Sequence, residues 1–144
     1  MELDFAFLAD AADVSMGKLF VLGGAFDTIH VQAFPATHPV LAVVLRLLLG
    51  PLDLDRKHEL QILLLDADGK HIASANGELT MPKAPGSPPG WKQNVILPLR
   101  FFNVPFKEEG HYSIEILADG KMAKAIPLRV ILAPSPAAQG PTNH

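Results

Sequence analysis

The sequence contains no cysteine in its 144 residues. Without thiols the chain can form neither disulfides nor thiolate zinc sites nor iron–sulfur clusters, and it has no cysteine nucleophile. A chain of this length buries about two-thirds of the surface that it exposes when unfolded, so its apolar core alone can stabilise one domain. We therefore expect a domain that needs no cross-link, and the absence of cysteine permits a reducing compartment.

An excess of positive charge is also missing. Lys and Arg number 12 and Asp and Glu number 15, which gives a formal net charge of -3 at pH 7. Proteins that bind nucleic acid neutralise its phosphates with a basic surface. Nucleic acid is therefore not an expected partner.

Long apolar runs are absent too. The longest run, residues 40–49, contains Arg46, whereas a helix that spans a membrane needs about 20 apolar residues. Glu2 and Asp4 lie where a secretory signal carries basic residues, so residues 1–13 are predicted to form a strand of the mature protein. We therefore expect a soluble cytoplasmic protein that does not associate with a membrane.

Recognisable catalytic and metal-binding patterns do not occur. The sequence has no Gly-x-Ser-x-Gly elbow, and its six histidines show none of the spacings of a zinc site. Asp66 and Asp68 fail as a calcium loop, because His71 stands where that loop needs glycine. We predict no catalytic, cofactor-binding or metal-binding residues and no cofactor, with the histidines solvated or hydrogen-bonded at the surface.

What the sequence does contain is a repeated alternation of apolar and polar residues, which is the period of a β-strand. The alternating segments are residues 3–7, 60–64, 95–101 and 112–116. Three further runs, residues 18–22, 40–49 and 125–132, are apolar between Gly or Pro, which favours strands buried on both faces. Residues 40–49 fit a short buried helix as well, but their three valines favour a strand. About eight strands result.

The motif Ala-Asp-Gly-Lys occurs twice after an aliphatic run, at residues 67–70 and 118–121. A three-residue hairpin loop, in which a type I turn is followed by a left-handed glycine, suits both copies. In this register Asp66 lies opposite Lys70, Leu64 lies opposite Ile72, and Ile126 lies opposite Tyr112. Both copies are thus predicted to be hairpin turns.

The segment "EEGHYSIEI" carries a glycine two residues before Tyr112 and an isoleucine two residues after it. This arrangement resembles the tyrosine corner of immunoglobulin-like domains. With the short strands and tight hairpins it predicts an all-β fold, an antiparallel immunoglobulin-like β-sandwich of about eight strands over residues 1–132. Residues 133–144 are rich in proline without apolar periodicity and are predicted to be a disordered tail.

A second Pro-rich segment, residues 81–90, is predicted to be a long surface loop, because its prolines remove backbone donors. The only tryptophan, Trp91, follows this segment directly. Trp91 either pins its own loop to the sandwich or anchors a partner protein together with Pro88 and Pro89. Pro88, Pro89 and Trp91 are the candidate partner-binding residues.

Short motifs follow one another in a fixed order in the first third of the chain. An acidic residue ends the first predicted strand, Gly-Lys-Leu opens the second, a glycine follows, and Phe-Pro precedes the third. These residues are Asp10, Gly17, Lys18, Leu19, Gly23 or Gly24, Phe34 and Pro35. In this order, and in the later strands and Asp-Gly turns, most of residues 1–132 resembles a family of short uncharacterised bacterial β-sandwich proteins. The Pro-rich segment departs from that pattern. The resemblance implies a bacterial β domain and no particular activity.

The apolar content is high for a small domain. Hydrophobic residues make up 49% before glycine is counted, whereas about 45–50% is usual with glycine included. We expect another chain to cover part of this surface, most simply in a homodimer. Pro98 and Pro127 would interrupt strand pairing at their own positions, so face-to-face packing is expected.

These features favour a non-catalytic interaction or assembly module with an unidentified protein partner. The alternative is a small-ligand-binding protein or a hydrolase, whose polar residues would converge from loops at one end of the sandwich.

Overall fold

The computed structural model describes residues 1–134. In this range the chain forms nine strands and one short 3-10 helix, η1 (Pro51–Asp53). The strands are β1 (Glu2–Ser15), β2 (Lys18–Gly24), β3 (Thr28–Val31), β4 (Ala36–Leu49), β5 (Lys57–Leu65), β6 (His71–Thr80), β7 (Gln93–Phe106), β8 (Gly110–Ala118) and β9 (Lys121–Leu132). The predicted tail, residues 133–144, lies outside the described residues except for its first two. Across the described range, no helix combines the length and the apolar character that crossing a membrane would need.

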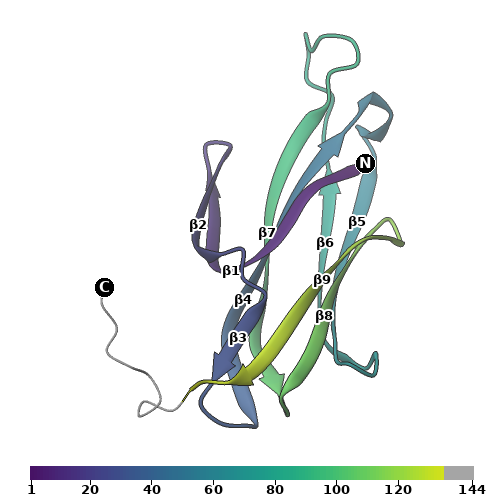
Figure 1. Cartoon of the computed structure of the whole chain (residues 1–144). Coiled ribbons are helices and arrows are strands. Elements are labelled where there is room, and N and C mark those ends of the chain that lie inside the picture. Colours follow the sequence, from purple (N-terminus) through teal and green to yellow (C-terminus); the bar gives the residue numbers. More distant parts are fainter. Residues whose placement is uncertain (135–144) are drawn as a thin grey trace.

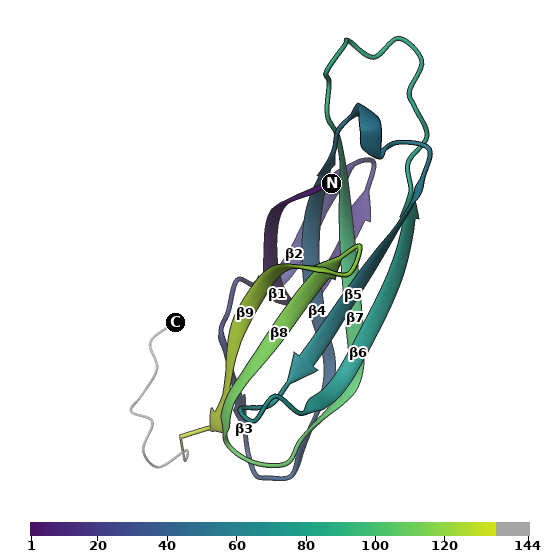
Figure 2. The same ribbon diagram turned by 90° about the vertical axis from the view of Figure 1, so that its right-hand side faces the viewer.

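The strands form two sheets that pack face to face (Figures 1 and 2). Sheet A has the strand order β2-β1-β4-β7, and sheet B has the order β3-β9-β8-β5-β6. The pairs are antiparallel except for β3 with β9, which is parallel. The predicted all-β sandwich is confirmed. The strand missing from the prediction is β3, whose four residues are too few to show an alternation.

Residues 40–49 lie in a strand, as predicted. β4 is an inner strand of sheet A between β1 and β7. Leu41, Val43 and Leu45 belong to the core between the sheets, whereas Ala42 and Val44 belong to a second cluster on the outer face of sheet A. All five are fully buried. Burial on both faces explains why this segment has no polar alternation.

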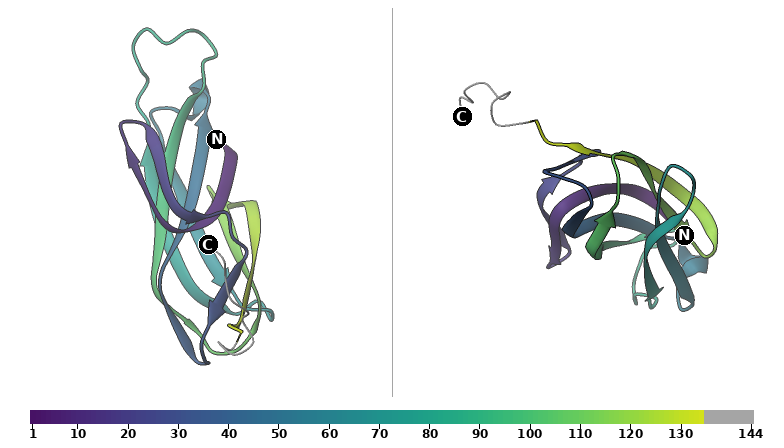
Figure 3. Two further views of the ribbon diagram at one scale, coloured as in Figure 1. Left: turned by 60° about the vertical axis from the view of Figure 1, so that its left-hand side comes forward. Right: turned by 90° about the horizontal axis from the view of Figure 1, so that it is seen from below.

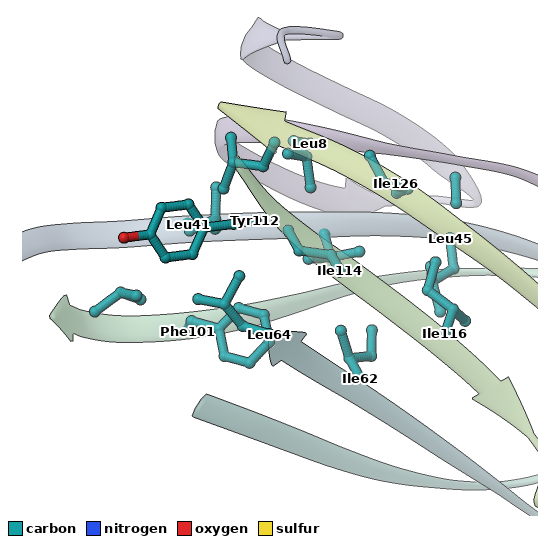
Figure 4. Close-up of a cluster of buried hydrophobic side chains, with 14 of the residues drawn as sticks. Leu8, Leu41, Leu45, Ile62, Leu64, Phe101, Tyr112, Ile114, Ile116 and Ile126 are labelled. Atoms are coloured by element: carbon teal, nitrogen blue, oxygen red, sulfur yellow. The ribbon is translucent and has the colours of Figure 1, made fainter. Parts of the chain in front are cut away.

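The main core lies between the two sheets (Figure 4). Leu8 and Leu45 from sheet A meet Ile62, Leu64 and Ile114 from sheet B, and each of these side chains is fully buried. Burying such a side chain stabilises the fold by roughly 1.5–3 kcal/mol. The inward residues follow the period of two that the sequence shows.

The tyrosine corner is present at the start of β8. The Tyr112 hydroxyl donates a hydrogen bond to the Glu108 carbonyl oxygen at 2.6 Å, four residues upstream. The Tyr112 ring also packs edge-on against Phe106, with 5.0 Å between the ring centroids. This contact fixes the β7–β8 corner.

The predicted register of the β8–β9 hairpin is wrong. Its loop has two residues, because Asp119 (φ 50°) and Gly120 (φ 79°) both take left-handed conformations and Ala118 pairs with Lys121. This geometry is a type I′ turn, which Asp-Gly favours. A bulge between Ile116 and Leu117 then shifts the ladder, so that Ile126 pairs with Ile114 and not with Tyr112.

The β5–β6 hairpin matches the prediction at its loop but not beyond it. The Asp66 amide donates to the Lys70 carbonyl oxygen at 2.9 Å, and the Asp66 carboxylate accepts from the Asp68 and Lys70 amides. A register shift next to Leu64 then pairs this residue with Ala73 instead of Ile72. Neither bulge has a signal in the residue types around it.

Two of the three strands that were predicted to be buried on both faces are not. In β9, Ile126, Leu128 and Val130 are buried but the residues between them are exposed, as in a strand with one solvated face. β2 is almost wholly exposed. It is the terminal strand of sheet A and only β1 pairs with it, so the apolar run there has no second layer to cover it.

Candidate functional site

The Pro-rich loop projects from one end of the sandwich between β6 and β7 (Figure 2). The Trp91 amide donates to the Pro88 carbonyl oxygen at 3.1 Å, which closes a turn around Pro89. Trp91 is 63% exposed. The tryptophan therefore does not pin its loop to the sandwich. Binding of a partner by Pro88, Pro89 and Trp91 stays a prediction.

A buried histidine that the sequence did not reveal lies at the same end as this loop. His58 is 1% exposed. Its Nδ1 lies 2.7 Å from Oδ2 of Asp119, and its Nε2 lies 2.6 Å from the carbonyl oxygen of Asp53. Asp119 also accepts a hydrogen bond from the Glu59 amide at 2.9 Å. His58 thus joins η1 to the β8–β9 turn. The expectation that the histidines lie at the surface is wrong here, because only the folded chain brings Asp119 to His58.

Both partners of His58 are hydrogen-bond acceptors, since a carbonyl oxygen and a carboxylate cannot donate. Both ring nitrogens must therefore donate, and the ring is an imidazolium. The hydrogen bond to Asp119 raises the pKa of His58, and the bond to the Asp53 carbonyl raises this pKa further. The same bond lowers the pKa of Asp119. With both nitrogens engaged, His58 has no free position for accepting a proton from a substrate.

Histidines also line a hollow of about 420 Å³ near the start of β3, with His30, His38 and Asp10 among the residues around it. The Nε2 of His38 is buried and has no hydrogen-bond partner among the described residues. In residues 1–134 no three His, Asp or Glu side chains come close enough together to hold a metal ion. The hollow therefore offers isolated polar groups without a ligand set.

The outer face of sheet A, which is turned away from sheet B, carries the most unusual surface. β1 pairs with β4 only as far as Ala9 and then continues with β2 as a hairpin. Figure 3 shows the strong curvature of β1 (purple). The Arg100 guanidinium of β7 donates to the carbonyl oxygen of Ala12, which holds the hairpin over this face. A second apolar cluster fills the space beneath it, formed by Ala9, Ala12, Ala42 and Val44 with Phe5, Phe7, Leu19 and Ile96 at its margin.

The side of the hairpin that faces solvent is apolar as well. Met16 is 96% exposed, Leu22 is 73% exposed, Phe20 is 58% exposed and Val21 is 36% exposed. We call these four residues the hairpin surface. A hollow of about 430 Å³ beside it is lined by Phe20, Leu22, Val40 and Arg100 among others. In the first 134 residues, no segment covers Phe20 or Leu22.

The glycines at the end of β2 mark a close approach between parts of the chain. Gly23 has φ 60°, and a Cβ atom placed there would lie 2.2 Å from Oδ2 of Asp10. At Gly24 a Cβ atom would lie 2.6 Å from Cγ1 of Val21. Because glycine has no Cβ atom, the hairpin can bend back over sheet A at these two positions without a clash.

The two packed sheets, their strand order and the tyrosine corner define an immunoglobulin-like β-sandwich domain. Residues 4–131 match the model of the family of unknown function DUF6941, and the chain belongs to that family. The predicted resemblance to an uncharacterised family is thereby confirmed. A comparison with curated proteins gives no match.

Two solved structures are similar to parts of the chain. One is a β-glucuronidase from glycoside hydrolase family 2, with 12% sequence identity and a TM-score of 0.33 over 69% of this chain and 11% of that protein. The other is a glycosyl hydrolase family 2 member from Bacteroides cellulosilyticus, with 14% identity and a TM-score of 0.33 over 67% of this chain and 14% of that protein. This chain therefore spans only a small part of either protein.

Proposed function

We propose that this domain is a non-catalytic interaction or assembly module and that it contacts its partner through the hairpin surface. The observation that carries the proposal is the exposure of Phe20 and Leu22 on β2, an apolar strand covered by nothing in the described chain. A contiguous apolar patch of this kind is typical of a surface that another protein covers.

The tip of the hairpin supports the same proposal. Met16 has φ 52°, a conformation that residues other than Gly, Asn and Asp rarely adopt. Its side chain is almost fully exposed, so neither turn chemistry nor burial by residues 1–134 accounts for a methionine there. Flexible, polarizable methionines are well suited to binding surfaces. When a residue is unfavourable for its backbone conformation and does not stabilise the fold in another way, a functional role is the expected reason for it.

The Pro-rich loop is proposed as a second contact. Exposed Trp91 next to Pro88 and Pro89 presents a large rigid apolar surface at the opposite end from β3. Tryptophan is among the residues that contribute most to protein interfaces. The proposed setting is the bacterial cytoplasm, where a chain without cysteine meets no oxidative constraint.

The proposal is tested by affinity purification of the tagged chain from its native cells beside two double variants. Phe20→Ser with Leu22→Ser removes two of the four apolar side chains of the hairpin surface, and Met122→Ser with Leu132→Ser removes two similarly exposed apolar side chains from β9. We expect the wild type and the β9 variant to retain the same partner and the hairpin variant to lose it. Equal retention by all three proteins would refute the role of the hairpin surface.

A further inference from the structure

The free edge of β2 presents backbone amides and carbonyl oxygens that suit pairing with a second copy of the same strand. We propose that two chains pair antiparallel along β2, about a two-fold axis at Val21, so that sheet A continues from one subunit into the next. This inference rests on the proposed interaction role and names its partner.

The backbone of β2 is suited to this pairing. Ser15 and Lys18 flank the two-residue turn and form the first pair of the β1–β2 ladder. In a two-residue hairpin this closing pair is hydrogen-bonded, and bonded and non-bonded pairs then alternate along the ladder. Phe20 therefore directs its amide and carbonyl toward β1, whereas Leu19 and Val21 direct theirs toward the free edge. No strand of the described chain occupies this edge.

The side chains match in the same register. Val21 is the midpoint of Lys18–Gly24, so a two-fold axis there centres the pairing on the extended part of the strand, which bends at Gly23 (φ 60°). Phe20 then lies opposite Leu22 of the second copy, and each apolar side chain gains an apolar cross-strand neighbour. Lys18, the only charged residue of β2, lies opposite Gly24, which avoids a contact between like charges.

The other three sheet edges carry features that discourage strand addition. β7, at the far edge of sheet A, contains Pro98 and Pro105. β6 carries the charged Glu78, which is paired with Lys57, and β3 is only four residues long. Prolines, charges and short length are the usual protections of an edge. Apart from the charge of Lys18, its first residue, β2 has none of these protections. Pro98 and Pro127, which argue against edge pairing elsewhere, lie on β7 and β9.

The available area is consistent with a dimer of modest affinity. An aromatic side chain buries roughly 150–250 Å² and the smaller Met, Leu and Val less, so the exposed fractions of the hairpin surface amount to at most about 500 Å² per copy. The backbone edge of seven residues adds to this area. A standard interface buries about 800 Å² per partner, and weaker complexes bury less than about 600 Å². We therefore expect a dissociation constant on the order of micromolar.

The test combines two substitutions at the proposed axis. Val21→Pro removes the amide that faces the free edge and leaves the β1–β2 hydrogen bonds in place, whereas Val21→Thr keeps the amide and the β-branched shape. By light scattering after size exclusion, the wild type and Val21→Thr should give twice the 15.5 kDa of one chain at tens of micromolar. Val21→Pro should give a monomer with an unchanged far-UV spectrum.

Val21→Cys provides a readout that does not depend on the proline variant. The native chain has no cysteine, and residues facing each other in a bonded antiparallel pair lie about 5.5 Å apart, within disulfide range. Oxidation should link Val21→Cys into a dimer and leave Met122→Cys, an exposed control on β9, unlinked. A wild type that is monomeric at every concentration would overturn the inference. A dimer that persists in Val21→Pro without a Val21→Cys link would overturn it as well. The partner-capture experiment judges the interaction role separately, since a monomer can still bind another protein.

Discussion

At the scale of single residues, His58 is the clearest case of a side chain whose role depends on the fold. It is the only buried polar or charged residue in the described chain. It is held as a cation by Asp119, 61 positions away in the sequence, and by the Asp53 carbonyl. Arg56 lies near enough to lower the pKa of His58 slightly, but the two acceptors outweigh it. Only the His58 end of this pair is buried, since the Asp119 side chain is 40% exposed. Removing an acceptor would leave a buried cation without its partner, which is destabilising, so His58 ties the loop end of the sandwich together.

This geometry predicts that stability decreases at alkaline pH. The pKa of His58 is raised in the folded state above its ordinary value of 6.5. Its contribution is therefore complete below about pH 6.5 and is lost as pH rises through the folded pKa, with a slope of at most about 1.4 kcal/mol per pH unit. Urea unfolding between pH 5.5 and 9 measures this decrease.

Asp119→Asn is the matched control for the pH profile. An asparagine amide can donate to Nδ1 of His58 and still accept from the Glu59 amide, so the folded variant would hold a neutral imidazole. The pKa of His58 would then fall below its unfolded value, so the stability of the variant should rise with pH up to about pH 6.5 and stay level above it, where the wild type loses stability. Parallel profiles for the two proteins would contradict the imidazolium assignment.

At the scale of elements, every strand except the short β3 was predictable, whereas the hairpin registers were predicted correctly only at the β5–β6 loop. Alternation identified 60–64, 95–101 and 112–116, because each strand has one face on the core. The residue types around Leu64 and Ile116 do not indicate the bulges there. A bulge forms because the register that the turn sets differs from the register that places the apolar side chains in the core. The prediction that β2 is buried on both faces was wrong. An apolar run indicates a strand that favours burial, but it does not show whether another layer of the same chain covers that strand.

The β1–β2 turn gives a prediction at this scale. Met16→Asn should stabilise the domain by about 0.5–1 kcal/mol, because asparagine tolerates the left-handed conformation that Met16 adopts and Asn-Gly favours a type I′ turn. Thermal unfolding of the variant measures the gain. The same change at Met122, an exposed strand residue outside the positive-φ set, should give no gain. If both changes stabilise the domain, the left-handed turn conformation is not the cause of the gain.

At the scale of the whole molecule, the apolar excess seen in the composition has a location. Part of it forms the second cluster beneath the hairpin on sheet A, and part remains on the hairpin surface. Composition predicts that another chain covers some of this surface, and the topology, in which β2 is a terminal strand beyond β1, gives the place that we propose for this contact. The candidate loop residues near Trp91 were identified from the sequence, whereas Phe20 and Leu22 were not.

Amide hydrogen exchange along β2 tests the central claim most directly, because adjacent residues should behave differently. Phe20 and Leu22 direct their amides to β1 and should be protected at any protein concentration. Leu19 and Val21 direct theirs to the free edge, so their protection should appear only as concentration rises through the micromolar range and should disappear on dilution. Fast exchange of Leu19 and Val21 at every concentration would show that nothing pairs with this edge and would contradict the account.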